Sequence, residues 1–219
     1  MTQLAVDSAK AAKILEAFRT DHGTMIPDSI LKNAKGVAIL DVFKAGIGIS
    51  GRHGSGVVVA RLPNGSWSAP SAIETTSIGF GSQFGAQVTE FVIILNDDEA
   101  VDSFKKAHNF TAGGNLSVAA GPFGAAVEAG GQVNNKVIAP IYSYSRSQGL
   151  FAGASLEFGA ISANKEVNLE AYGAGITSEQ ILEGFVPRPE YATQLYWVLD
   201  KTVSNEGITA PAQKKQDEE

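Results

Sequence analysis

The sequence predicts an α+β fold: a strongly curved, glycine-rich antiparallel β-sheet or barrel-like core, flanked by N- and C-terminal helices. Two blocks of β-branched and apolar residues, at about 36–95 and 115–173, are interrupted by glycine or by Pro-Asn-Gly. The chain contains 24 glycines, most of them inside or beside these strands. Glycine within a strand usually marks a bulge, a sharp bend or a close backbone approach. A strongly curved sheet needs such positions.

The first expected element is a helix over residues 4–19, which Asp21-His22-Gly23 ends. Its apolar residues share one side at 100° per residue: Leu4, Ala11, Leu15 and Phe18. Lys10 and Lys13 flank this stripe. The pattern is typical either of a helix packed on a core with a solvated edge or of an amphipathic element on a bilayer.

Between residues 36 and 95 we expect several short antiparallel strands, with a hairpin turn at Pro63-Asn64-Gly65. A helix should follow from Asn96 to about residue 107, its acidic start acting as cap and dipole partner rather than as a cation site. In the second β block, the segment NLEAYG (168–173) is also expected as a strand.

Helices at about 178–182 and 190–203 should close the fold. We therefore expect a single domain over residues 1–206 and a disordered charged tail over residues 207–219. The tail lacks aromatic residues and offers little apolar surface to bury.

A literal G-x-G-x-x-G occurs at Gly46, Gly48 and Gly51. In a dinucleotide-binding loop this motif opens a helix whose N-terminus faces the pyrophosphate. Here the next segment is the β-branched run Gly56–Leu62, so the context indicates a strand and excludes the nucleotide loop.

The sequence offers little for catalysis. Cysteine is absent, and the three histidines (His22, His53 and His108) are far apart without metal-ligand spacing. Neither a nucleophile elbow nor a phosphate-binding P-loop occurs. We therefore expect a non-enzymatic domain without cofactor or metal. The sequence also shows no secretory signal and no apolar run of about 18 residues, which favours a soluble intracellular protein.

The charge is unevenly distributed. Residues 1–62 carry eight Lys or Arg against five Asp or Glu, whereas the whole chain has a formal net charge of −6. A basic third on an acidic body can orient a protein toward an anionic surface. Ordinary solvated surface charge explains the same composition. Nucleic acid is not expected as a partner, because the chain has no basic domain or RNA-binding signature.

Several segments together resemble the SYLF domain, in the order and spacing of that family. They are KAAKIL (10–15), KGVAIL (35–40), KAGIGISGRHGSGVVVARLPNGSWSAPSAI (44–73), FVIILN (91–96), GGNLSVAAGP (113–122) and SRSQGLFAGASLE (145–157). The resemblance runs from about residue 4 to residue 203. It implies a non-enzymatic β-rich domain flanked by helices that binds phosphoinositides and associates with actin. In fungal members it implies actin-filament binding or bundling at endocytic patches.

The resemblance also implies partners and positions. It points to actin filaments and anionic phospholipids, with the protein in the cytoplasm, peripheral at a membrane or at cortical actin patches. Lys10 and Lys13 match basic positions of the family's N-terminal membrane-binding segment. Basic positions of its β block are matched by Lys35, Lys44, Arg52 and Arg61.

The chain departs from the family's pattern at other basic positions. Ala125 stands where many members have Arg, and only Lys165 remains of an Arg-rich stretch. Each cation lost near an anionic leaflet removes about 1 kcal/mol of attraction. We therefore expect weaker lipid binding than in more basic relatives. We also expect a single-domain form without the SH3 domain found in many relatives, and hence no SH3-mediated partners.

One alternative of another class remains open: a small-ligand carrier or an enzyme using a pocket in the β core. It requires a concave site with convergent polar groups. A filled core without a pocket would exclude it.

Overall fold

The computed structural model describes residues 1–20, 25–105, 118–120 and 140–201. In chain order its elements are α1 (Gln3–Thr20), α2 (Asp28–Asn33), β1 (Gly36–Ala60), β2 (Ser71–Leu95), α3 (Asp98–Lys105), β3 (Val118–Ala120), β4 (Ile141–Ala163), α5 (Lys165–Tyr172), α6 (Ser178–Leu182), the short 3₁₀ helix η1 (Glu190–Ala192) and α7 (Thr193–Asp200).

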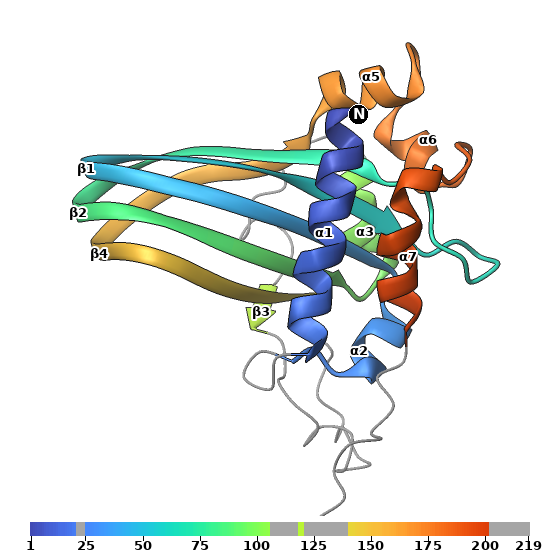
Figure 1. Ribbon diagram of the computed structural model, residues 1–219, viewed down its shortest axis with the longest axis horizontal. Helices are drawn as coiled ribbons and strands as arrows, with labels where there is room; N and C mark the ends of the chain where they lie inside the picture. The colour runs from blue at the N-terminus through green and yellow to red at the C-terminus, as the bar shows by residue number, and fades with distance from the viewer. Residues whose placement is uncertain (21–24, 106–117, 121–139, 202–219) are drawn as a thin grey trace, which may run out of the picture.

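The described strands form one sheet in the order β1-β2-β4-β3. β1, β2 and β4 pair antiparallel over almost their whole length, while the short β3 pairs parallel with the start of β4. Each long strand bends at one end of the molecule and runs back, so that the sheet is folded over into two layers (Figure 1). The curved antiparallel sheet expected from the sequence is therefore confirmed, and it is not closed into a barrel.

The β2–β4 register is unbroken through the bend, from Ile73–Ala163 to Leu95–Ile141. The β1–β2 register shifts once, between Ile47 and Ile49. The strands therefore bend together rather than ending at separate turns. The bulge supplies the local irregularity that a sharp bend of a paired strand needs.

Two glycines of β1 allow its two halves to approach closely. A Cβ atom at Gly56 would lie 2.0 Å from the carbonyl oxygen of Ile39, and one at Gly54 would lie 2.6 Å from that of Asp41. The even-numbered side of β1 therefore faces the inside of the folded sheet. Only glycine permits backbones to approach this closely, so the fold is tight along β1.

We divide the folded sheet by its register into a base and a tip. The tip comprises residues 43–53 of β1, 76–88 of β2 and 148–160 of β4; the remaining residues of these strands form the base. The helices gather at the base, whereas the tip extends away from them (Figure 1).

Both faces of the base are apolar and covered. On the outer face, odd-numbered residues of β1 such as Ile39 and Val59 join a buried cluster with residues of α1 and α7. On the inner face, even-numbered residues such as Leu40 and Val58 join a second cluster with residues of α3 and α6. Because successive side chains of a strand point to opposite faces, alternate residues of the same strand contribute to the outer and the inner cluster.

The N-terminal helix is a packing element. Its expected apolar stripe lies within the outer cluster: Leu4, Ala11, Leu15 and Phe18. At its end, the buried Arg19 guanidinium donates to the carbonyl of Val198 in α7 and pairs with Asp28 of α2. The helix is therefore attached to the sheet by apolar contact and to both neighbouring helices by one cation.

Two sequence expectations were wrong. The block over residues 36–60 is one continuous strand of 25 residues, not a series of short strands. The segment NLEAYG is the second half of helix α5. The side chain of Asn164 accepts a hydrogen bond from the backbone N–H of Val167, and Gly173 ends the helix at a φ of 88°. These are ordinary helix start and stop signals, and they prevail over the β pattern.

Other expectations are confirmed. The turn at Gly65 has a φ of 85°, helix α6 has the expected bounds, and the side chain of Asp97 caps α3 by accepting from the N–H of Ala100. The glycine motif at Gly46 and Gly51 lies within β1, as its context predicts. Residues 121–139 of the second β block and the tail at 207–219 lie outside the described residues.

Candidate functional site

The tip differs from the base in where its apolar and charged side chains lie. Large apolar side chains of its outer face are exposed: Phe43, Ile47, Ile49, Ile78, Phe84 and Val88. The exposed fraction reaches 76% at Ile47 and 67% at Phe84. Soluble domains rarely expose contiguous apolar patches unless a partner contacts them. We call these six residues the apolar tip.

Beneath this surface, where base and tip meet, the inner face contains a cavity of about 240 Å³. Two cations of β1 reach it, Lys44 from one layer and Arg52 from the other. The remaining described residues around it are neutral: Val42, Gln87, Thr89, Phe91, Ser145 and Ser147. The cavity therefore combines positive charge with hydroxyl, amide and aromatic groups.

The predicted site residues Lys44 and Arg52 are thus brought together, but inside the fold. Only 7% of Lys44 is exposed, and the Arg52 guanidinium stacks 5.6 Å from the ring centroid of Phe91. A hydroxyl pair lies close by, with 2.8 Å between Thr89 Oγ1 and Ser147 Oγ. Ser145 and Ser147 are exposed, so the cavity communicates with solvent along β4.

The two predicted cations of α1 lie on the exterior and differ in their contacts. Lys10 Nζ lies 2.5 Å from Asp41 Oδ2 of β1, an ion pair that ties the helix to the sheet. Lys13 is exposed and makes no ion pair with any residue that the structure describes. Lys13 is consequently the better placed of the two for an external anionic partner.

Arg61 has a structural role. Its guanidinium donates to the carbonyl oxygens of Ala34 (3.0 Å), Leu31 (3.2 Å) and Gly65 (3.1 Å). It also stacks 4.0 Å from the ring centroid of the buried Trp67. Burial lowers the pKa of Arg61. These contacts join the end of α2 to the β1–β2 connection.

Lys35 lies at the start of the sheet with an exposed side chain. Its backbone N–H donates to Leu95, and its carbonyl accepts from the N–H of Arg61. The six predicted cations therefore occupy three settings: an exposed surface (Lys10, Lys13 and Lys35), the cavity (Lys44 and Arg52) and a structural joint (Arg61). They do not form one continuous face.

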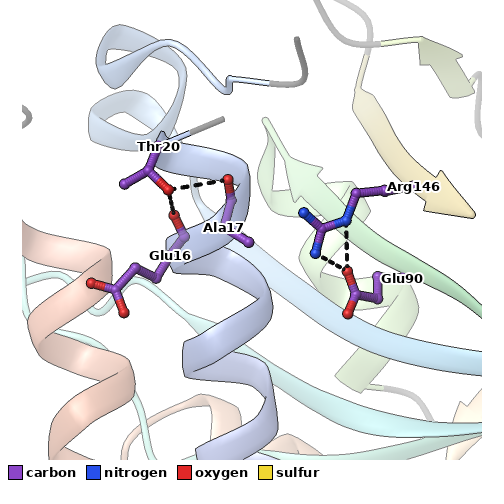
Figure 2. A network of polar contacts seen from close by, with 5 residues as sticks. All are labelled: Glu16, Ala17, Thr20, Glu90 and Arg146. Carbon is purple, nitrogen blue, oxygen red and sulfur yellow. Dashed lines mark hydrogen bonds and ion pairs between the residues drawn. The ribbon is translucent and has the colours of Figure 1, made fainter. Parts of the chain in front are cut away.

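Sequence reasoning missed a cation on the outer face. Arg146 of β4 pairs across the sheet with Glu90 of β2, donating from Nε (3.0 Å) and Nη2 to the same carboxylate oxygen (Figure 2). The guanidinium also lies 5.6 Å from the ring centroid of Phe18 in α1. Figure 2 shows this pair beside the end of α1, where Thr20 donates to the carbonyls of Glu16 and Ala17. No short sequence motif predicts the Arg146–Glu90 ion pair, because the two residues are opposite in register but 56 residues apart in sequence.

The joint between α1 and β1 also holds a buried carboxyl group. Asp7 Oδ1 accepts hydrogen bonds from Gln3 Nε2 (3.0 Å) and Ser55 Oγ (3.2 Å). Burial raises the pKa of Asp7, and the nearby Asp41 carboxylate acts in the same direction. Nearby Lys10 acts in the opposite direction as a smaller influence.

Across the described part of the chain, no three His, Asp or Glu side chains are arranged to hold a metal ion. None of the described helices is long and apolar enough to cross a membrane. The arrangement that remains is a folded sheet with external cations, an apolar tip and a cationic inner cavity. It is that of an α+β domain whose distinctive surfaces suit binding.

Comparison with known proteins identifies the family. A sequence profile described as "Las17-binding protein actin regulator" (Ysc84) matches residues 76–202. The chain belongs to this family, whose domain is the SYLF domain. The resemblance noted from the sequence is thereby confirmed. No solved structure shows significant similarity.

Three relatives illustrate the relationship. The chain is 46% identical over 209 residues to the SH3 domain-containing protein PJ696.02 of Schizosaccharomyces pombe, covering 93% of this chain and 49% of the relative. It is 45% identical over 221 residues to the human SH3 domain-containing YSC84-like protein 1, covering 97% and 64%. It is 44% identical over 207 residues to the protein YSC84 of Saccharomyces cerevisiae, covering 92% and 44%. The chain thus spans about half to two thirds of the length of these relatives.

Proposed function

We propose that this chain is a non-enzymatic peripheral adaptor that binds actin filaments, anionic phosphoinositide membranes or both, and acts in endocytosis or cortical actin organisation. The observation that carries the proposal is membership of a family described as actin regulators, with 44–46% identity to the relatives above. We infer a role in the actin pathway from membership of the family. Membrane binding is proposed in addition, on the basis of the surface features of this chain.

The outer surface supports the membrane part. Lys13 and Lys35 are exposed cations, and the apolar tip extends from the same molecule. Peripheral proteins combine electrostatic attraction to anionic lipid with apolar contact at the interface. The whole chain carries a net charge of −6, so binding depends on local cations rather than on overall charge.

The test is co-sedimentation with actin filaments and, separately, with phosphatidylcholine vesicles with and without phosphatidylinositol 4,5-bisphosphate. Lys13→Glu should weaken binding about tenfold or more, because it reverses one charge near the partner. Lys32→Glu is the matched control, since Lys32 is also exposed but lies in α2 rather than on α1. Lys10→Gln should have a smaller effect, because Lys10 already pairs with Asp41.

Binding should fall as salt rises, since the Debye length shortens from about 10 Å at 0.1 M to about 3 Å at 1 M ionic strength. If the wild-type chain sediments with neither filaments nor anionic vesicles at low salt, the proposal is wrong. Equal losses in Lys13→Glu and Lys32→Glu would contradict the assignment to α1.

A further inference from the structure

The register of the sheet divides the apolar tip into two groups. Four of its members form two cross-strand pairs on the outgoing part of β1: Phe43 with Val88, and Ile47 with Phe84. We call these four residues the tip face. Ile49 and Ile78 lie beyond the register shift in β1, on the part of the sheet that runs back, and do not belong to the tip face.

The tip face has a relief that matches its own shape. Between its two pairs lies a third pair, Ala45 opposite Ala86. These alanines share the outer face with their bulky neighbours, because every second residue of a strand points to the same side. Ala86 is exposed and Ala45 is half-buried. The surface is therefore a shallow dip between two apolar ridges, and a ridge of one copy fits the dip of another. The fit is reciprocal when a twofold axis relates the copies.

The inner side of the same strand segments is polar. Lys44 lies opposite Gln87, between two of the outward pairs, and both residues line the inner cavity. Because side chains alternate along a strand, the fold could bury the apolar row only by moving this polar row to the surface. The tip face can therefore be covered only from outside the chain's own sheet.

The side of the tip face next to the base is charged but balanced. Its next cross-strand pair is Asp41 opposite Glu90. Asp41 pairs with Lys10 of α1, and Glu90 pairs with Arg146 of β4. An apolar centre with a polar rim is the usual anatomy of a protein interface. Two copies that meet through this surface bring no excess of like charge together.

The exposed apolar area agrees with what a dimer needs. The four side chains of the tip face are between 39% and 76% exposed. They present about 400 Å² of apolar surface if each whole side chain offers about 180 Å². A stable interface buries about 800 Å² per partner, of which about 60% is apolar. The tip face therefore supplies most of the apolar part of such an interface.

We propose that the tip face is the interface of a twofold-symmetric dimer of this chain, in which each copy places an apolar ridge in the alanine dip of the other. The helices of the two copies then lie at the far ends of the dimer, because they gather at the base of each sheet (Figure 1). The dimer presents every surface of the base twice and can bridge two partners. The proposal does not depend on actin or membrane binding.

The test is the mass of the full chain in solution, measured by analytical ultracentrifugation from about 1 to about 100 µM. The mass should rise from that of one chain to that of two, with a Kd of about 10 µM. Ile47→Glu should weaken association about 100-fold or more, because the twofold axis buries the unpaired carboxylate twice. Ile78→Glu is the matched control. It makes the same change at an exposed residue outside the tip face and should associate as the wild type does.

A second variant tests shape rather than apolarity. Ala86→Phe fills the dip, so a ridge no longer fits there, and association should weaken about tenfold or more. The same substitution enlarges the apolar surface, so nonspecific clustering or contact with a bilayer would increase instead. The parent residues Ile47 and Ala86 are exposed. The circular dichroism spectra of both variants should therefore match that of the wild type, which separates loss of association from loss of folding.

Four results would overturn the proposal. The first is a wild-type chain that stays monomeric at about 100 µM. The second is a dimer that Ile47→Glu leaves intact or that Ile78→Glu weakens equally, because it would use another surface. The third is tighter association in Ala86→Phe, which would show contact without the reciprocal fit. The fourth is a monomer that binds phosphatidylcholine vesicles and loses this binding in Ile47→Glu, which would assign the tip face to a bilayer.

Discussion

The base and the tip are built from the same three strands but distribute their side chains in opposite ways. At the base, helices cover the outer face and both faces are apolar. At the tip, isoleucine and phenylalanine side chains are exposed on the outer face, while two cations line the cavity beneath. Strand alternation alone therefore does not determine what is buried. The covering helices make the base a core and leave the outer face of the tip exposed.

The largest expected difference is between two isoleucines on the same face of β1. Ile39 is fully buried in the base, whereas 76% of Ile47 in the tip is exposed. Ile39→Ala should lower the free energy of unfolding by about 3 kcal/mol, because it leaves a cavity in the outer cluster. Ile47→Ala should change it by less than about 0.5 kcal/mol.

Urea denaturation of both variants measures the difference. Similar losses would show that the tip is as tightly packed as the base, and the comparison would fail.

A second contrast uses two glycines of β1. A Cβ at Gly56, in the base, would lie 2.6 Å from Leu40 Cα and closer still to the Ile39 oxygen, whereas one at Gly51, in the tip, meets nothing within 4 Å. Gly56→Ala should therefore destabilise the protein by about 2 kcal/mol, since backbone must shift. Gly51→Ala should be neutral or slightly stabilising, because it restricts the unfolded chain.

Thermal unfolding monitored by circular dichroism compares the two. A Gly56→Ala variant as stable as the wild type would show that the two halves of β1 are not held together by close backbone contact.

The smallest expected effect concerns Asp7 of α1, whose side chain accepts a hydrogen bond from Ser55 in the base. Because burial raises its folded-state pKa above the usual 3.8, folding favours the protonated carboxyl group. Its stabilising contribution is complete below the unfolded-state pKa and is lost as pH rises through the folded-state pKa. Asp7→Asn keeps an acceptor for Gln3 and Ser55. It should raise stability at neutral pH by about 1 kcal/mol, with a flatter pH dependence above 3.8.

Denaturation midpoints from pH 3.5 to 7 test this expectation. Parallel curves for wild type and Asp7→Asn would show that Asp7 does not titrate differently in the folded state.

Local patterns were sufficient for much of the fold. The apolar stripe of α1, the turn at Gly65 and the acidic start of α3 act through neighbours in sequence, so composition and spacing predict them. The family resemblance rests on such local segments as well. The continuous strands were missed because a glycine that permits a close approach looks the same in sequence as one that ends a strand.

The candidate site was only partly predictable. The sequence identifies Lys44, Arg52 and Arg61 as cations in a β region, but it does not reveal that the first two enter a cavity while the third supports α2. These roles depend on how far the sheet folds over. The helix α5 carried a usable signal in Asn164 and Gly173, which the β pattern around it obscured.

The long ladders also constrain how the chain reaches its native state. The β1–β2 pair that is nearest in sequence, Val58 and Ser71, is separated by one short connection. Pairing of this hairpin can therefore begin at that end and extend along the strands. The β2–β4 ladder has no such start, because even its nearest pair, Leu95 and Ile141, is separated by residues 96–140, which include α3 and β3. Closing a long loop costs entropy before any contact forms, and nonlocal pairing slows folding. We therefore expect β4 to dock late, so the open side of the cavity forms in the final stage of folding.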